Sequence, residues 1–372
     1  MKNILSLHKN GLPPKAYICP DIFKNEMREV FHKNWVFIGF KSSLSKPNDF
    51  ITASIGGVPV VVQNFDGYLK AFLNVCAHRR ASLQITDCGN RKLICPYHGW
   101  TYDKYGRPVG IPDNQNSFRI QSDNESNKIG LKEYELEICG NFVFVCIEPS
   151  RETLREFLNV HWDVIEHISN LIKFPLKNRK IPWLANWKIG VESVLEIYHV
   201  AQVHPETFKK FTQSRWDFSA QGKHSTGHSD LSPEAIKWWG RVRRLIGLPK
   251  SELLSDYNHY FIYPNLAIAV TNGTLMSVQT YDPVDSGECF LNYRLFVGET
   301  VETSSISGVH EDSIFNSVTT FNEQVLNEDR LISEQCQLNM NFVDNPAIMG
   351  TCEDRIFDFH ESLRSDVNYG VL

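Results

Sequence analysis

Two short segments in the first half of the chain each carry one cysteine and one histidine. One residue separates Cys76 from His78 and two separate Cys95 from His98, with sixteen residues between the pairs. A thiolate and an imidazole on each of two tight loops can hold one metal centre from both sides. A single Cys-x-His pattern usually arises by chance, but its repetition in a different spacing within one short β segment predicts a metal site.

The mixture of ligand types in each pair bears on which metal is bound. Four Cys and His ligands can hold a structural zinc ion, but zinc fingers usually group Cys with Cys and His with His. Here each pair supplies one ligand of each type. A two-iron cluster with two Cys on one iron and two His on the other suits this distribution. Imidazoles in place of thiolates remove negative charge and raise the reduction potential, so such a cluster can pass electrons onward.

A second group of candidate ligands lies in the middle of the chain. At about 100° per residue, Glu192, Glu196 and His199 are expected on one face of a helix. On a regular helix His204 would point about 140° away from His199. For both histidines to bind one metal, the helix must end or widen between them. Pro205 favours this because it pushes the preceding residue out of the helical region.

Two histidines and one carboxylate form the facial triad of non-haem Fe(II) sites, which leaves positions open for O₂ and substrate. We expect the carboxylate from a later helix, on which Phe321, Val325, Ile332 and Cys336 mark an apolar stripe. Asp329 falls on this stripe, and a carboxylate that faces a core is costly unless it is paired or binds metal. An ion pair with a nearby arginine is the alternative. Glu328, about 100° around the helix, is the second choice of ligand.

The elements that must position the first group indicate a small all-β unit between Trp35 and about Pro149. Val58–Gln63 is an apolar strand, and Leu69–Leu73 is expected to be the strand that returns from it after a short turn. Asp103–Arg107 gives a second hairpin signal just beyond the second Cys/His pair.

The remainder of the chain has an α+β pattern, in which helices pack on one face of an antiparallel sheet. The expected helices are 21–34, ahead of the all-β unit, and then 152–172, 189–203, 314–338 and 354–364. The expected strands are 260–270, 274–281 and 289–297. Two polar stretches, 217–230 and 298–313, are expected to be loops.

Composition excludes several classes of protein. The 372 residues suit about two domains, and 42% hydrophobic with 22% charged residues is typical of a globular chain. A formal net charge of −5 favours neither nucleic acid nor an anionic membrane as partner. No apolar run approaches the roughly 20 residues of a membrane span, and the start lacks a signal-peptide core, so we expect a soluble, cytoplasmic protein. Nine cysteines in a chain this long do not indicate a disulfide framework.

The residues around both patterns resemble the alpha (catalytic) subunits of Rieske-type non-haem iron oxygenases. The resemblance rests on Cys-Ala-His-Arg-Arg at 76–80, Cys-Pro-Tyr-His-Gly-Trp-Thr-Tyr-Asp at 95–103, and the segments 263–266 and 353–360. It covers most of the chain, from about Trp35 to Arg364. One departure is Arg80, which stands where the family usually has glycine and leaves all four ligands in place.

This resemblance implies an α+β fold in three parts. An N-terminal segment, 1–34, precedes an all-β Rieske [2Fe-2S] domain, 35–150, and a catalytic domain, 151–372, has an antiparallel sheet flanked by helices in a helix-grip arrangement. The implied cluster ligands are Cys76, His78, Cys95 and His98. The implied ligands of one mononuclear Fe(II) are His199, His204 and Asp329.

The resemblance also implies a terminal oxygenase component. Electrons would come from NAD(P)H through a separate reductase, with or without a ferredoxin, since the chain shows no flavin or dinucleotide fingerprint. In a head-to-tail homotrimer, His98 of one subunit would hydrogen-bond Glu196 of the next, which would contact and orient His199. Most members have Asp at this bridge. The longer Glu196, found also in relatives that oxidise quaternary amines, either permits gating or fits a different spacing.

Two other functions stay open at the level of sequence. One is an electron carrier with only a Rieske centre, which would need no His199, His204 or Asp329. The other is a zinc-stapled binding module, which iron and sulfide analysis would separate from an oxygenase. Within the oxygenase prediction, both hydroxylation of an aromatic or aliphatic C–H and oxidative demethylation of a methylated or quaternary amine are open. Trp238 and Trp239 could hold a cation by cation–π attraction, although packing is the commoner role of such residues.

Overall fold

The computed structural model describes residues 9–120, 128–172, 174–211, 216–245, 254–298 and 308–369. The chain forms two compact units. One is Phe31–Ser169, and the other joins the residues up to Val30 to those from Asn170 onward. The first helices therefore belong to the second unit, and these limits differ from the boundaries after residues 34 and 150 that the sequence suggests. Both Cys/His pairs lie in the first unit, and the Glu/His group and Asp329 lie in the second.

The Phe31–Ser169 unit is built on a seven-stranded antiparallel sheet. Its strand order is β2-β10-β9-β5-β4-β3-β6. The strands are β2 (Val36–Phe40), β3 (Asp49–Ile55), β4 (Val58–Phe65), β5 (Tyr68–Leu73), β6 (Cys88–Asn90), β9 (Glu133–Cys139) and β10 (Phe142–Cys146). A separate pair, β7 (Thr101–Tyr102) and β8 (Pro108–Gly110), follows the second Cys/His loop.

Both hairpins predicted in this unit are confirmed. β4 and β5 pair around Asp66 and Gly67, whose φ angles of 52° and 96° match the left-handed pair that a tight two-residue turn needs. β7 and β8 pair around Asp103–Arg107, where the Asp103 carboxylate accepts the Arg107 backbone N–H at 2.9 Å. The second Cys/His loop lies against the sheet core, where Cys95 and Trp100 pack in one cluster with Val61 and Phe72.

The helix predicted at 152–172 is interrupted. α4 (Leu154–Leu158) begins with a reciprocal capping box between Thr153 and Glu156. A single turn, Asn159–His161, separates it from α5 (Trp162–Leu171), and Asn159 has a positive φ of 46°. A regular helix cannot continue through such a residue.

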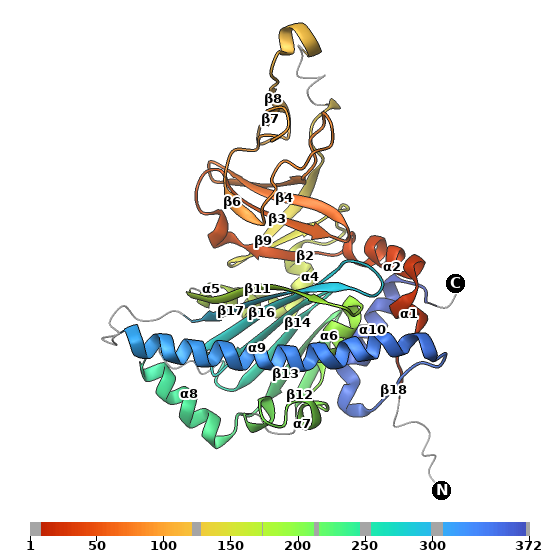
Figure 1. The fold of residues 1–372 in the computed structure, drawn as a ribbon, viewed down its shortest axis with the longest axis vertical. Coiled ribbons are helices and arrows are strands. Elements are labelled where there is room, and N and C mark those ends of the chain that lie inside the picture. The colour runs from red at the N-terminus through yellow and green to blue at the C-terminus, as the bar shows by residue number, and fades with distance from the viewer. Residues whose placement is uncertain are drawn as a thin grey trace. The chain divides into compact units, whose positions relative to one another are not determined.

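The second unit contains another seven-stranded antiparallel sheet, in the order β11-β17-β16-β15-β14-β13-β12. The strands are β11 (Phe174–Trp183), β12 (Asp217–Gln221), β13 (His224–Ser229), β14 (Tyr257–Ile262), β15 (Leu266–Thr271), β16 (Leu275–Pro283) and β17 (Cys289–Val297). The long helix α9 (Gly308–Asn339) crosses one face of this sheet (Figure 1).

The other helices of this unit are short or moderate in length. They are α1 (Lys15–Ile18), α2 (Pro20–Glu26) with a wider π-type turn at Met27–Phe31, α6 (Trp187–Leu195), α7 (Val200–Val203), α8 (Pro233–Leu245) and α10 (Asp354–Asp366). The strands β1 (Lys9–Asn10) and β18 (Ile348–Met349) also pair. Among the described residues, no helix is long and apolar enough to cross a membrane.

Three predictions about these elements are wrong. The polar stretch 217–230 is not a loop but the hairpin β12–β13, because pairing with β14 supports strands that carry few apolar residues. The single strand expected at 260–270 is two strands, β14 and β15, since Pro264 cannot donate to a strand ladder and lies in the turn. In the expected loop 298–313, residues 299–307 lie outside the described residues and 308–313 are already part of α9.

Candidate metal centres and substrate cavity

The two Cys/His loops have the same backbone hydrogen bonds. In each loop the cysteine N–H donates to the carbonyl five residues later, at 2.8 Å from Cys76 and from Cys95. The N–H four residues later donates back to the cysteine carbonyl, at 3.0 Å in both loops. This folding turns each cysteine inward, and both are almost fully buried.

The residue that closes each loop has a left-handed backbone. Gly99 closes the second loop with a φ of 74°, and Arg80 closes the first with a φ of 64°. Glycine adopts this region without cost, whereas a residue with a Cβ pays about 1–2 kcal/mol. Arg80 therefore keeps the loop geometry that the family usually obtains with glycine, at the expense of local strain.

The histidines of the two loops lie side by side. The rings of His78 and His98 are 4.7 Å apart between centroids, and Trp100 stacks on His78 at 5.1 Å. His98 is exposed, and Tyr97 stacks on its ring at 3.8 Å. The structure thus brings together two buried thiols and two adjacent imidazoles.

The surroundings of these side chains fit a bound metal cluster. His78 Nδ1 is buried and has no hydrogen-bond partner among the described residues, an expensive arrangement unless a ligand completes it. Tyr102 Oη lies 3.2 Å from Cys76 Sγ and accepts the backbone N–H of Ala77 at 3.0 Å. Burial and, to a smaller extent, the neighbouring Cys76 raise the pKa of Cys95, although the backbone N–H groups of Tyr97 and His98 oppose this shift. A metal that binds the thiolates would remove that cost.

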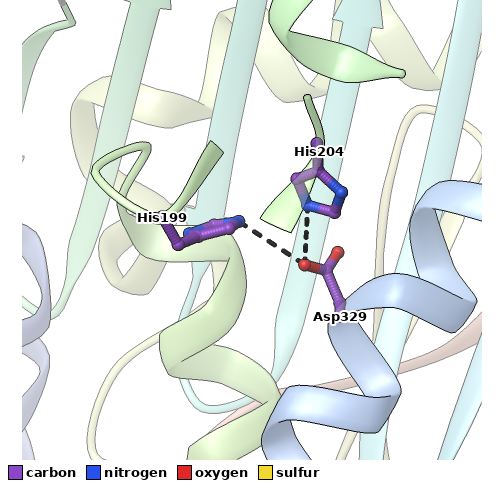
Figure 2. A group of neighbouring side chains, drawn as sticks. All are labelled: His199, His204 and Asp329. Atoms are coloured by element: carbon purple, nitrogen blue, oxygen red, sulfur yellow. Dashed lines mark hydrogen bonds and ion pairs between the residues drawn. The ribbon is translucent and has the colours of Figure 1, made fainter. Parts of the chain in front are cut away.

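The second centre brings together His199 and His204, which flank the short helix α7, and Asp329 of α9 (Figure 2). Asp329 Oδ1 lies 2.9 Å from His204 Nε2 and 3.4 Å from His199 Nε2. One ligand atom from each residue lies within 4.8 Å of the other two. This donor set is the two-histidine, one-carboxylate arrangement that suits non-haem Fe(II).

Each histidine of this group contacts a glutamate through Nδ1, the ring nitrogen that does not face Asp329. His204 Nδ1 lies 2.7 Å from Glu328, whose carboxylate also accepts the Thr207 hydroxyl at 2.8 Å. His199 Nδ1 is hydrogen-bonded to Glu196. Carboxylates in these positions fix the tautomer that leaves Nε2 available to a metal. Glu328, the second choice of ligand from the sequence, therefore orients a histidine, while Asp329 faces both Nε2 atoms.

The helix predicted over 189–203 ends much earlier, so the shared helical face of Glu192, Glu196 and His199 is wrong. α6 stops at Leu195, and Glu196 is extended, with φ −136° and ψ 169°. The Glu196 carboxylate then accepts the backbone N–H groups of Tyr198 and His199, which begin the turn into α7. A carboxylate that captures these donors competes with helix continuation.

Glu192 lies in a different environment from Glu196. Its carboxylate accepts the Tyr17 hydroxyl at 2.7 Å and lies 2.8 Å from His360 Nε2. These partners come from α1 and α10, so Glu192 ties α6 to the helices that surround it. It takes no part in the group of three ligands.

The charges of the metal-ligand group balance one another. Burial alone would lower the pKa of His199, but hydrogen bonds to Asp329 and Glu196 raise it to about 10. Burial has the same effect at His204, where Asp329 and Glu328 raise the pKa. Burial opposes ionisation of Asp329, while the two histidines lower its pKa. The carboxylates thus create a site that favours a cation, which a metal can supply in place of the protons.

A cavity of about 330 Å³ opens beside these three residues. This is at the small end of the range for ligand pockets, roughly 300–1,000 Å³. Its walls are mostly apolar and aromatic, and they include Phe208, Trp216, Trp238, Trp239, Tyr257 and Phe321. The apolar stripe predicted on α9 is confirmed only in its first part: Phe321, Val325 and Asp329 line this cavity, whereas Ile332 and Cys336 are exposed.

Several residues of the cavity carry no motif that sequence analysis could use. Tyr257 and His259 lie two residues apart on β14, so their side chains are on the same face of the sheet, and both line the cavity. Ala269 of β15 pairs with His259, and Ser277 of β16 pairs with Ala269. Both residues also line the cavity. The strand predicted from the sequence, 260–270, includes neither Tyr257 nor His259, and which face of the sheet meets the cavity depends on where α9 lies.

Comparison with known proteins identifies the family. A family model described as "Ring hydroxylating alpha subunit (catalytic domain)" matches residues 160–368. A second, "Rieske [2Fe-2S] domain", matches residues 34–135. The chain belongs to the ring-hydroxylating alpha subunit family. The resemblance and the fold class predicted from the sequence are confirmed, and the cofactors that this membership implies are a Rieske cluster and a mononuclear iron.

Individual relatives support the same assignment. The chain is 29% identical over 240 residues to the glycine betaine monooxygenase oxygenase subunit of Pseudomonas aeruginosa, covering 62% of this chain and 53% of that one. It thus spans about half the length of that subunit. It is 25% identical over 328 residues to the large oxygenase component of naphthalene 1,2-dioxygenase from Pseudomonas fluorescens, covering 77% and 71%.

Solved structures show the same fold. The quaternary ammonium Rieske monooxygenase CntA in complex with L-carnitine superposes with a TM-score of 0.77 at 20% identity, covering 97% of this chain and 96% of that chain. Naphthalene 1,2-dioxygenase from Rhodococcus sp. with indole bound superposes with a TM-score of 0.75 at 17% identity, covering 95% and 94%.

Proposed function

We propose that the chain is the terminal oxygenase component of a Rieske oxygenase. It would use O₂ and electrons that a separate reductase, with or without a ferredoxin, relays from NAD(P)H in the cytoplasm. The product would be a hydroxylated or oxidatively demethylated small organic molecule. The observation that carries this proposal is the convergence of His199, His204 and Asp329 on the wall of a mostly apolar cavity.

Each centre has a separate part in this proposal. Cys76 and Cys95 would hold one iron of the cluster, and His78 and His98 the other. An Fe(II) held by two histidines and one carboxylate supplies O₂ activation, because coordination positions remain open. The apolar walls of the cavity would hold the substrate next to that position and exclude bulk water.

Glu196 is proposed to connect the centres of neighbouring subunits in a homotrimer. In this proposal the exposed His98 of one subunit donates to Glu196 of the next, and Glu196 holds His199 as described above. A structure of CntA is described as revealing insights into inter-subunit electron transfer.

The trimer proposal has a direct test in mixed oligomers. Subunits with Cys95→Ser would lack the cluster, and subunits with Asp329→Ala would lack the mononuclear iron. Each variant alone should be inactive, whereas trimers reassembled from both should recover part of the activity, because an intact cluster then neighbours an intact iron site. Mixtures that assemble but stay inactive would contradict electron transfer between subunits.

The relatives act on two classes of substrate, and the cavity accommodates both. Aromatic walls suit a flat aromatic compound, and Trp238 and Trp239, whose rings meet edge to face at 4.5 Å, also suit a quaternary ammonium group. Trp238 and Trp239 line the cavity, which supports the cation proposal made from the sequence.

Metal analysis and isotope labelling test the oxygenase proposal. The purified protein should contain about three irons and two labile sulfides per chain, and no stoichiometric zinc. With a surrogate reductase and ¹⁸O₂, a panel of quaternary amines, methylated aromatics and aromatic acids should give a labelled product or formaldehyde. Two irons per chain with no product would support an electron carrier, and zinc without sulfide would support a binding module.

A further inference from the structure

Arg355 of α10 is buried without an acidic partner. It is 2% exposed, and no carboxylate in the described part of the chain forms an ion pair with it. Burial lowers the pKa of Arg355 to about 9, a shift that the more distant charge of Asp358 only partly opposes. Its Nε donates to the Ser225 hydroxyl at 3.1 Å, and its Nη1 is buried without a hydrogen-bond partner. A buried guanidinium usually has an anion to balance its charge, because isolated burial of a cation is very costly.

The surroundings of Arg355 are shaped to admit it. Trp216 covers the guanidinium at 5.3 Å from the ring centroid. A Cβ on Gly227 would lie 2.6 Å from Trp216 Cε3 and 2.7 Å from Arg355 Nη1, closer than any real Cβ contact. Because Gly227 has no side chain, Arg355 and Trp216 have the space to pack together. Gly227 is the residue of β13 that pairs with His259 of β14.

Arg355 fixes the tautomer of His259. Its Nη2 lies 3.0 Å from His259 Nδ1. Since a guanidinium can only donate, Nδ1 must accept, and the neutral ring then carries its proton on Nε2. Burial, followed by the charge of Arg355, holds the pKa of His259 well below its usual range, so the ring stays neutral. His259 Nε2–H has no partner among the described residues.

His259 brings this donor to the substrate cavity. The side chain is 3% exposed and forms part of the cavity wall together with Trp216 and Tyr257. A succession of neighbouring rings separates it from the metal-ligand group, from His204 through Phe208 to Tyr257. The cavity wall thus includes Asp329 with the two histidines and, on β14, a neutral donor whose other ring nitrogen contacts a cation.

We propose that His259, backed by Arg355, is the specificity determinant that binds a carboxylate group of the substrate. The inference rests on the proposed oxygenase function and narrows its substrate class to organic carboxylates, whether the oxidised end is aromatic or methylated. The carboxylate accepts the Nε2–H of His259 and partly balances the charge of Arg355. This places the rest of the molecule toward His199, His204 and Asp329.

A carboxylate explains this end of the cavity better than a neutral acceptor. A carbonyl or hydroxyl would accept the same hydrogen bond but would leave the buried charge of Arg355 uncompensated. A carboxylate makes a charge-assisted bond, which is roughly twice as strong as a neutral one. The guanidinium also opposes protonation of His259, so the donor is available without a change of charge on the ring.

Binding measurements on the reduced holoenzyme under nitrogen test this inference without turnover. The probes are matched pairs of equal shape: glycine betaine with betaine amide, benzoate with benzamide, and 2-naphthoate with 2-naphthamide. The variants are His259→Leu, which removes the donor, and His259→Gln, which keeps one. His228→Leu is the control, because His228 lies on the neighbouring strand and outside the cavity. Visible circular dichroism of the cluster verifies that each variant is folded.

At least one carboxylate should bind about 10- to 100-fold more tightly than its amide, the range expected for a hydrogen bond to a charged group. His259→Leu should remove that preference by weakening the carboxylate alone, and His259→Gln should restore part of it. Equal binding of acid and amide in every pair, failure of all the acids to bind, or an unchanged preference in His259→Leu would overturn the inference. Oxygenase failure would appear separately, as carboxylate binding without any product.

Discussion

The two proposed cluster loops, Cys76–Ala81 and Cys95–Trp100, and the proposed iron-binding group, His199, His204 and Asp329, position their side chains by different means. Each cluster loop is a local structure, in which a cysteine and a histidine two or three residues apart are set by backbone hydrogen bonds within six residues. The proposed iron-binding group instead depends on Asp329 of α9 meeting His199 and His204, the residues that flank α7. The cluster loops should therefore tolerate changes elsewhere in the chain. The iron-binding group should not, because it also depends on Glu196 and Glu328, which hold the two imidazoles in place.

The largest effect should come from removing the ligand that joins the assembled group. Asp329→Ala should abolish binding of the mononuclear iron. Turnover should fall by more than about 100-fold, because replacing a residue that only supports a metal ligand can already cost about 100-fold. The visible spectrum of the cluster should persist, because its loops share no residue with this group. Iron and sulfide analysis of the purified variant measures both. Loss of the cluster in the same variant would break the distinction between the centres.

Glu196→Gln should have the next largest effect. It keeps a side chain able to bond His199 but removes the charge of the proposed bridge, so oxidation of the cluster should slow by about 10- to 100-fold while both metals remain. Stopped-flow reoxidation of the reduced protein measures this rate. Glu234→Gln, an exposed change on α8, is the matched control. An unchanged rate in Glu196→Gln would show that this residue is not the bridge.

Glu328→Gln tests the support behind His204. A neutral amide is a weaker acceptor for His204 Nδ1, so iron affinity should fall by about 10-fold with little change in the cluster. Competition with an iron chelator gives the affinity. Glu323→Gln on the same helix, which contacts Lys177 and Arg179 instead, should leave the affinity unchanged. If Glu328→Gln and Glu323→Gln lowered the iron affinity equally, the cause would be the loss of a negative charge on α9 and not the contact with His204.

The smallest effect concerns the strained residue of the first loop. Arg80→Gly should relieve a left-handed conformation at a residue with a Cβ and, after the greater flexibility of unfolded glycine is subtracted, stabilise by about 0.5–1 kcal/mol. The Tm of the holoprotein, followed through the cluster, should rise by about 2 °C. Gly99→Ala, at the matching position of the second loop, should lower it. A lower Tm for Arg80→Gly would show that its side chain supports the loop.

The sequence predicted the cluster loops well because their information is local. Ligand types, spacing and flanking residues are all contained in about 25 positions, and both adjacent hairpins were predicted from turn residues. The left-handed backbone at Arg80 could not be predicted, since arginine rarely adopts it. In this region the structure adds details of backbone conformation to the prediction, and the same side chains lie together.

The iron-binding group was predicted less completely. Residue types and the apolar stripe of α9 indicated His199, His204 and Asp329, but helical periodicity placed Glu192 on the same face as Glu196. The helix ends at Leu195 because the Glu196 carboxylate captures the next backbone donors, and periodicity cannot represent this. The support of His259 by Arg355 joins β14 to α10, a pairing that depends on the complete fold.

A single turnover tests the central claim most directly. The chemically reduced holoprotein, without any partner protein, would receive O₂ and a pooled panel of quaternary amines, methylated aromatics and aromatic carboxylates, with products identified by mass spectrometry. We predict that oxidation of the cluster is accompanied by one hydroxylated or demethylated product, and that Asp329→Ala gives none. A cluster that stays reduced in the presence of O₂ and the whole panel would contradict the coupling of the two centres, and with it the oxygenase function.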